Sequence, residues 1–124
     1  MTPKTINILY WIFTLLFCAA MLMDGIAGLM RVQDGKEGLA HLGYPEYLMS
    51  IVGIAKVLGV LAILQTKFKV IKEWAYAGFT INFIGASLSH YFMNDSMGMF
   101  LMPLVVLAFM FASYYLWKKK QAQA

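Results

Sequence analysis

The sequence predicts an all-α integral membrane protein, a four-helix bundle with both termini in the cytoplasm. Hydrophobic residues make up 61% of the 124 residues and charged residues only 13%, whereas soluble domains are about half apolar and a quarter charged. Four apolar segments are each long enough to form a transmembrane helix. All lysines other than Lys56 lie outside these segments. The length accommodates one domain, residues 1–124, and no separate soluble domain.

The four predicted spans cover about residues 6–30, 47–64, 74–93 and 97–117. At about 1.5 Å per residue, each approaches the thickness of the hydrocarbon core. The first is interpreted as a retained span and not as a cleaved signal, because no A-x-A site ends it. Each of the other three follows a connection of different chemistry, and these connections set the orientation.

Charges in the connections predict which side each one occupies. The segment 31–46 mixes both charge signs and is expected to fold as a short amphipathic piece on the membrane surface. The second connection carries Lys67, Lys69 and Lys72, and the C-terminal end carries lysines at 118–120. Short lysine-rich loops stay in the cytoplasm. Both termini are therefore predicted inside, and the turn at 94–96, which has no positive charge, outside.

Two further patterns concern helix packing and membrane depth. Gly78, Asn82, Gly85 and Ser89 recur at helical spacing, which predicts a small and polar face for close approach of another helix. Tyrosine and tryptophan residues gather near the span ends and are expected at the headgroup level. They are Tyr10, Trp11, Tyr44, Tyr47, Trp74, Tyr76, Tyr91, Tyr114, Tyr115 and Trp117.

The most informative residue is Lys56, near the middle of the second predicted span. An ammonium at that depth costs on the order of 2.5–3.5 kcal/mol, so it should have a polar partner. Counting from the span ends puts Asn82 at the same depth and Asp24 within reach of a snorkelling lysine. We therefore expect an Asp24–Lys56 ion pair, with Asn82 bonded to one of the two.

These residues outline a predicted polar pocket that opens outward. Its members are Asp24, Lys56, Asn82 and His90, with Glu46 and Ser89 as secondary members. The rival interpretation is that the ion pair only holds helices in register. Ser87 and Ser89 are each expected to bond a carbonyl of their own helix. No metal site is predicted, because His41 and His90 have no supporting ligand pattern.

Several segments resemble the DoxX-like family of membrane proteins. These are LGYP at residues 42–45, KEWAYAGF at 72–79, SH at 89–90 and SYY at 113–115. The resemblance implies four transmembrane helices, and it implies a link to a thiosulfate:quinone oxidoreductase subunit or to other membrane redox complexes. The chain departs from the family pattern at Asn82, where an acid is common, and at Asp24, where a small or hydroxyl residue is common. The partner of Lys56 would then have moved to the first span.

The leading functional prediction is a small DoxX-like protein of the bacterial inner membrane that acts as an accessory or binding subunit. One alternative is a quinone-linked oxidoreductase subunit in sulfur or thiol oxidation, with quinone as the cofactor. Classical catalytic motifs are absent from the sequence,. The last alternative is a small four-span transporter. The expected partners are the lipid bilayer, a membrane or redox protein, or further copies of the chain, and not nucleic acid.

Overall fold

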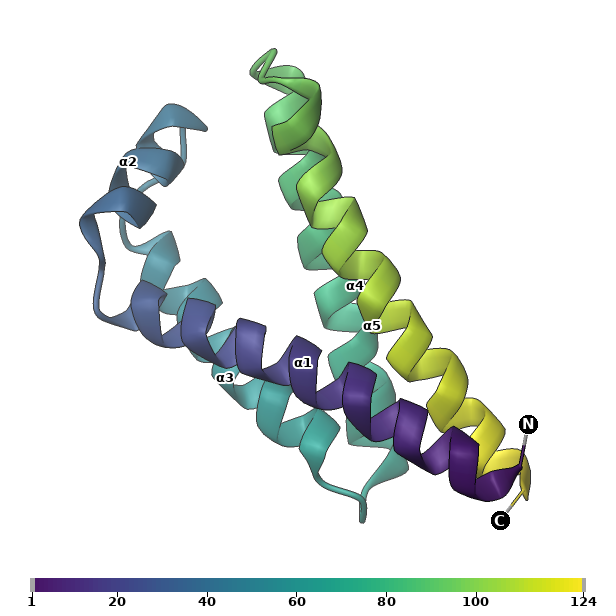
Figure 1. Ribbon diagram of the computed structural model, residues 1–124. Helices are drawn as coiled ribbons and strands as arrows, with labels where there is room; N and C mark the ends of the chain where they lie inside the picture. Colours follow the sequence, from purple (N-terminus) through teal and green to yellow (C-terminus); the bar gives the residue numbers. More distant parts are fainter. Residues whose placement is uncertain (1, 124) are drawn as a thin grey trace.

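The computed structural model describes residues 2–123, and within them the chain forms five helices and no strand (Figure 1). The helices are α1 (Pro3–Leu29), α2 (Gln33–His41), α3 (Leu48–Leu64), α4 (Lys69–Phe92) and α5 (Met97–Gln123). The all-α prediction is confirmed. The connection after α1 contains a short helix, α2, where a short folded piece was expected.

Two of the helices are long and apolar enough to cross a membrane. These are α1 and α5, with 27 residues each. Helix α3 is also apolar but shorter, with 17 residues. Helix α1 begins with Thr2, whose side chain accepts a hydrogen bond from the Thr5 amide, and with Pro3 in the first turn, both favourable at a helix start.

The four long helices each contact two others. Helix α1 packs on α3 and α5, and α4 packs on the same two helices. In Figure 1, α1 with α3 and α4 with α5 form two arms. The arms meet near the start of α1 and the end of α5, and they diverge towards α2 and the α4–α5 turn. One end of the molecule is therefore closed and the other open.

Glycines allow α1 and α3 to approach closely near the open end. A Cβ atom added to Gly53 would lie 2.8 Å from the Gly25 carbonyl oxygen, and one added to Gly28 would lie 3.1 Å from the Met49 carbonyl oxygen. Both obstacles are backbone atoms, which cannot move aside as a side chain can. Small residues at this crossing let the two backbones touch.

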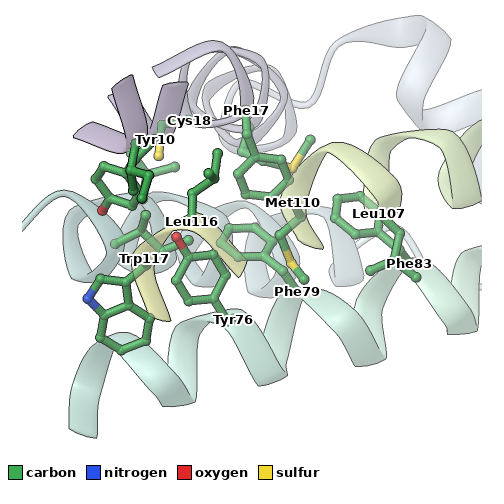
Figure 2. Close-up of a cluster of buried hydrophobic side chains, with 14 residues drawn as sticks. Tyr10, Phe17, Cys18, Tyr76, Phe79, Phe83, Leu107, Met110, Leu116 and Trp117 are labelled. Carbon is green, nitrogen blue, oxygen red and sulfur yellow. The ribbon is translucent and has the colours of Figure 1, made fainter. Parts of the chain in front are cut away.

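The hydrophobic core fills the closed end (Figure 2). Its α1 members all precede Asp24 in the sequence, and its α3 members follow Lys56. The buried side chains include Ile6, Tyr10, Phe17, Val60, Ile63, Tyr76, Phe79, Phe83, Met110, Leu116 and Trp117. All four long helices thus contribute to this core, whereas the residues that line the open end come from α1, α3 and α4 and from the segment around α2.

Three of the aromatic residues that were expected at the headgroup level are buried in the core. Tyr10, Tyr76 and Trp117 are 1%, 2% and 7% exposed and belong to the core, whereas Trp74 and Tyr91 are largely exposed. The Tyr76 hydroxyl is hydrogen bonded to Ser113 at 2.7 Å and so is satisfied inside the core. A phenol can be buried once its hydroxyl has a partner, so position near a span end did not decide its environment.

Helix α4 begins earlier than predicted. The Gln65 side chain accepts a hydrogen bond from the Phe68 amide at 2.7 Å and donates to the Phe68 carbonyl at 2.8 Å. This closes a short turn, and the helix starts at Lys69 and not near residue 74. Lys72, expected in a cytoplasmic loop, is instead a buried helical residue, 3% exposed.

The predicted packing face of α4 does not pack against a helix. A Cβ atom added to Gly78 or Gly85 would meet nothing within 4 Å. Both residues, with Asn82 between them, line cavities. The prediction of close helix approach is therefore wrong here, because spacing shows that residues share a face but not what lies opposite that face.

Candidate functional site

A cavity of about 680 Å³ occupies the open end, between α1, α3 and α4 and beneath α2. Four of the sequence-predicted pocket residues, Asp24, Lys56, Asn82 and His90, line it, as does Ser89. Most of its remaining wall is apolar, with residues such as Leu39, Leu42, Leu48, Val52 and Ile81. A mostly apolar wall with a few convergent polar groups is typical of a small-molecule site.

The Lys56 ammonium donates a hydrogen bond to the Asp24 carboxylate and forms an ion pair with it. The glycine crossing explains this contact, because a Cβ atom on Gly25 would lie 3.2 Å from the Lys56 Cβ atom. The two partners are unequally covered: the side chain of Lys56 is 15% exposed and that of Asp24 is 56% exposed. Loss of Asp24 would therefore leave the Lys56 ammonium shielded from water and without an anion, whereas loss of Lys56 would leave the Asp24 carboxylate open to hydration.

Asn82 faces the ion pair from α4 but does not join it. Among the described residues, its side chain makes no hydrogen bond, so the expected bond to Asp24 or Lys56 is not formed. It is part-buried and lines the first cavity and also a second one. A carboxamide that faces open space can both donate to and accept from a bound molecule.

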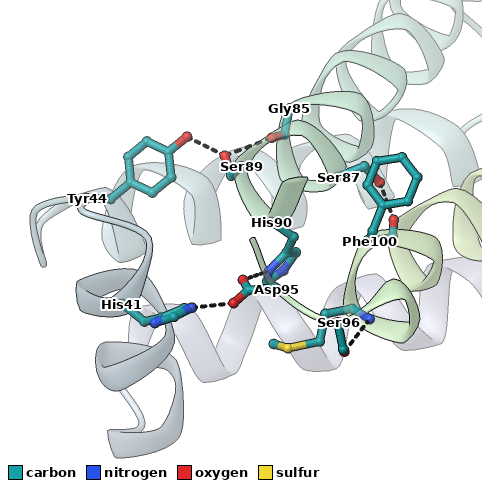
Figure 3. Close-up of polar contacts among 10 residues, drawn as sticks. His41, Tyr44, Gly85, Ser87, Ser89, His90, Asp95, Ser96 and Phe100 are labelled. Atoms are coloured by element: carbon teal, nitrogen blue, oxygen red, sulfur yellow. Dashed lines mark hydrogen bonds and ion pairs between the residues drawn. The ribbon is translucent and has the colours of Figure 1, made fainter. Parts of the chain in front are cut away.

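Two polar contacts join the segment around α2 to the end of α4 (Figure 3). The hydroxyls of Tyr44 and Ser89 lie 2.6 Å apart. The Asp95 carboxylate lies between two imidazoles, 2.6 Å from Nε2 of His41 and 2.7 Å from Nδ1 of His90. We call these two contacts the latch, because they fasten the α2 segment across the mouth of the cavity.

Two helix ends place the latch residues. Gly43 follows α2 with φ of +84°, and the Tyr44 amide then donates back to the Leu39 carbonyl at 3.0 Å. Asn94 follows α4 with φ of +56°, and the Asp95 amide donates to the His90 carbonyl at 3.0 Å. This left-handed ending is common for helices, and glycine and asparagine adopt it most readily.

The two serines of α4 behave differently from each other. Ser89 donates to the Gly85 carbonyl of its own helix at 2.8 Å, as predicted. Ser87 instead donates to the Phe100 carbonyl of α5 at 2.9 Å, so that prediction is wrong. Ser87 is buried at the α4–α5 contact, where a carbonyl of the neighbouring helix is the partner within reach.

Glu46 lies apart from the cavity wall. Its carboxylate pairs with Arg31 at 3.2 Å and with Lys36 at 3.3 Å, in an exposed cluster beside α2. It is absent from the cavity lining. Exposed ion pairs of this kind contribute little, about 0–1 kcal/mol each. Through these pairs Glu46 joins the α2 segment to the start of α3.

A second, more apolar cavity of about 410 Å³ lies between α3 and α4. Lys56, Asn82 and Val52 line both cavities. Beyond them the second cavity is walled by residues that include Leu58, Ala62, Trp74 and Phe79. The polar groups of Lys56 and Asn82 therefore lie where the second, mainly apolar cavity meets the first, larger cavity.

The latch residues His41, Tyr44 and Asp95 were missed by reasoning from the sequence. The turn at 94–96 was expected only to reverse the chain, and His41 was considered only as a metal ligand. One signal was available, since Asp95 is an acid five residues after His90 at a helix end. Within residues 2–123, no three His, Cys, Asp or Glu side chains are grouped so that they could hold a metal ion.

The latch should depend on the charge of Asp95. Hydrogen bonds from His90 and His41 hold the pKa of the Asp95 carboxyl below its ordinary value of 3.8. A lowered carboxyl pKa adds stability that is fully present above the ordinary pKa and is lost as pH falls through the lower, folded value. We expect Asp95→Asn to lower the thermal unfolding temperature at pH 5–7, and the difference from wild type to disappear at strongly acidic pH.

Asp34→Asn is the matched control for this change. Asp34 lies in the first turn of α2 and takes part in none of the ion pairs of the described residues. Its substitution should leave the pH profile of stability unchanged. Equal profiles for Asp95→Asn and wild type across this pH range would show that the latch contributes nothing.

The fold and the cavity together define a class: a small helical protein with two helices long and apolar enough to cross a membrane and with a cavity at one end. Comparison with known families makes this specific, because the DoxX-like family matches residues 12–113. The chain belongs to the DoxX-like family. No curated protein and no solved structure matches it.

Proposed function

We propose that this protein is a small binding or accessory subunit of the bacterial inner membrane, with one four-transmembrane-helix domain over residues 1–124. In this proposal the four long helices form a bundle that crosses the bilayer, with both termini cytoplasmic. Three features support it: family membership, the two long apolar helices, and the proximity of the start of α1 to the end of α5 (Figure 1). Lysines gather at that end, as they do on the cytoplasmic side of membrane proteins.

The observation that carries the proposed role is the Asp24–Lys56 ion pair in the wall of the cavity. An ion pair inside a membrane protein is costly to maintain and commonly marks a site for a ligand. Here the pair lines the first cavity, and the Asn82 carboxamide lines the same cavity. The site we propose therefore consists of Asp24, Lys56, Asn82 and His90, with Ser89 at its edge.

The wall chemistry indicates an amphiphilic ligand. Its polar part would meet Lys56 and Asn82, which can donate hydrogen bonds, and Asp24, which can accept them. Its apolar part would lie against the leucine, valine and isoleucine side chains of the same cavity. Because α2 and the latch cover the outer mouth, movement of the α2 segment would control entry.

A cavity-filling variant tests this role. We expect Ala86→Phe, which places a ring inside the first cavity, to remove a copurifying small molecule detected by native mass spectrometry of gently extracted protein. Ala77→Phe is the matched control. Ala77 is exposed on the same helix and lines neither cavity, so its substitution should leave the bound molecule in place.

Two results would contradict the proposed role. One is wild-type protein, extracted gently, that carries no bound molecule across several mild detergents. The other is a bound molecule that both variants retain equally. Circular dichroism and thermal unfolding of each variant should accompany the measurement, so that loss of the fold is not mistaken for loss of the site.

A second candidate function is a quinone-linked oxidoreductase subunit in sulfur or thiol oxidation. The observation that favours it is the meeting of the two cavities at Lys56 and Asn82. A quinone has a polar ring with two carbonyls and an apolar tail, so the ring would accept hydrogen bonds there while the tail follows the apolar groove. Titration of purified protein with a quinone analogue tests this candidate, and absence of saturable binding would exclude it for the isolated chain.

A further inference from the structure

Two ammonium groups converge on one aromatic ring at the end of the molecule opposite the cavity. Nζ of Lys72 lies 4.9 Å from the centre of the Tyr10 ring, and Nζ of Lys120 lies 4.5 Å from the same centre. Lys72 also donates a hydrogen bond to the Tyr10 hydroxyl. Trp117 and Trp11 complete the surroundings, at 5.1 Å from Lys72 and 5.5 Å from Lys120.

Neither ammonium has an anionic partner in the part of the chain that the structure describes. The ion pairs there involve other cations, such as Lys118 with Glu73, and none includes Lys72 or Lys120. Aromatic faces attract a cation with about 0.5–2 kcal/mol, but they carry no net charge. Two like charges thus share one ring without neutralisation, and Lys72 does so while almost fully buried.

We propose that Lys120 binds the phosphate of an anionic phospholipid in the cytoplasmic leaflet beside the Trp11 ring, with the buried Lys72 as a second positive charge behind the Tyr10 ring. Lys120 is part-buried near the end of α5 and can contact the phosphate directly. Lys72 supplies a second positive charge from behind the Tyr10 ring. This lipid site is separate from the cavity, and it uses only the membrane orientation proposed above.

Three observations favour a lipid as the source of the phosphate. The site lies near the start of α1 and the end of α5, the two helices that are long and apolar enough to span a membrane. Trp11, which is part-buried at this site, is of a residue type preferred at the membrane–water interface. Anionic lipids also give the cytoplasmic leaflet a negative potential that attracts lysines close to the surface.

A lysine swap with a neighbouring control tests the site. The affinity of full-length protein for phosphatidylglycerol and for phosphatidylcholine is measured by native mass spectrometry in a neutral detergent. We expect wild type to prefer phosphatidylglycerol and Lys120→Gln to weaken its binding at least about five-fold, the factor that corresponds to one lysine at the surface. Lys119→Gln removes the same charge one residue away, where the side chain lies over Tyr115, and should change the affinity less than about two-fold.

Three outcomes would overturn the proposal. Equal losses in Lys119→Gln and Lys120→Gln would show diffuse surface attraction and no site. Equal wild-type affinity for the two lipids would show that charge is not recognised. Full displacement of the lipid by millimolar inorganic phosphate would show a site for the free anion. Lys72→Gln should weaken binding in the same direction as Lys120→Gln, and if it fails to fold, Lys120→Gln alone decides.

Discussion

Replacing Asp24 with asparagine is expected to destabilise the protein more than replacing Lys56 with methionine. Asp24→Asn leaves a 15%-exposed ammonium without an anion, whereas Lys56→Met leaves a carboxylate that is 56% exposed and can be hydrated in the cavity. Loss of one partner of a buried polar contact costs about 1–3 kcal/mol, and we expect Asp24→Asn near the upper end. Thermal unfolding of the purified variants measures the difference.

The double variant separates a structural role from a binding role. Asp24→Asn with Lys56→Met removes both charges, so most of the lost stability should return, and the two single effects should not add. If the pair also serves the proposed site, the double variant regains stability but does not regain the bound molecule. Single variants as stable as wild type, with additive effects, would show that the two side chains are not coupled.

The control for Lys56→Met removes a lysine that does not line the cavity. Lys36→Met removes an exposed lysine of α2 that pairs with Glu46, and a change of this kind usually shifts stability by no more than about 0.5 kcal/mol. The contrast with Lys56→Met then reports the burial of Lys56 and not the loss of a lysine as such.

The helices could be predicted from the sequence because long apolar runs bounded by polar turns leave few alternatives. Helix α3 begins one residue after its expected start, and α5 begins where predicted. Helix α4 differs most, because a lysine-rich stretch was interpreted as a loop. The structure instead covers Lys72 with the rings of Tyr10 and Trp117, and no sequence pattern signals that a cation will be sheltered by aromatic residues from two other helices.

The polar contacts could be predicted only where a strong energetic requirement narrowed the choices. Lys56 inside an apolar run needs an anion, and few acids lie at a comparable depth, so Asp24 could be named. Asn82 has a weaker requirement, because a carboxamide at a cavity can bond water or a ligand, and it stays unbonded to Asp24 and Lys56. The latch joins residues 54 positions apart through two helix ends, whose geometry a single sequence does not reveal.

The glycines show a similar limit of prediction from the sequence, this time for helix packing. Gly53 and Gly78 look alike in the sequence, since each is a glycine within a predicted apolar span. In the structure, Gly53 touches the backbone of α1, whereas Gly78 borders a cavity. Which glycine is indispensable follows from the neighbouring helix and not from the spacing.

The largest effect of a single methyl group is therefore expected at Gly53. In Gly53→Ala, the new Cβ atom would lie 2.8 Å from the Gly25 carbonyl oxygen, closer than the two atoms can approach. Helices α1 and α3 must move apart, at a cost of about 1–3 kcal/mol. Gly78→Ala, the matched control, meets nothing within 4 Å and should gain up to about 1 kcal/mol from helix propensity. Thermal unfolding of the two variants should shift in opposite directions.

Gly53→Ala also tests whether the close crossing of α1 and α3 holds the Asp24–Lys56 ion pair together. Separation of α1 from α3 moves Asp24 away from Lys56, because Gly25 packs against both Gly53 and the Lys56 Cβ atom. The coupling between Asp24→Asn and Lys56→Met should then be smaller in a Gly53→Ala background than in wild type, and unchanged in a Gly78→Ala background. Coupling that persists in full after Gly53→Ala would mean that the ion pair forms without the close crossing, and the glycines would then serve packing alone.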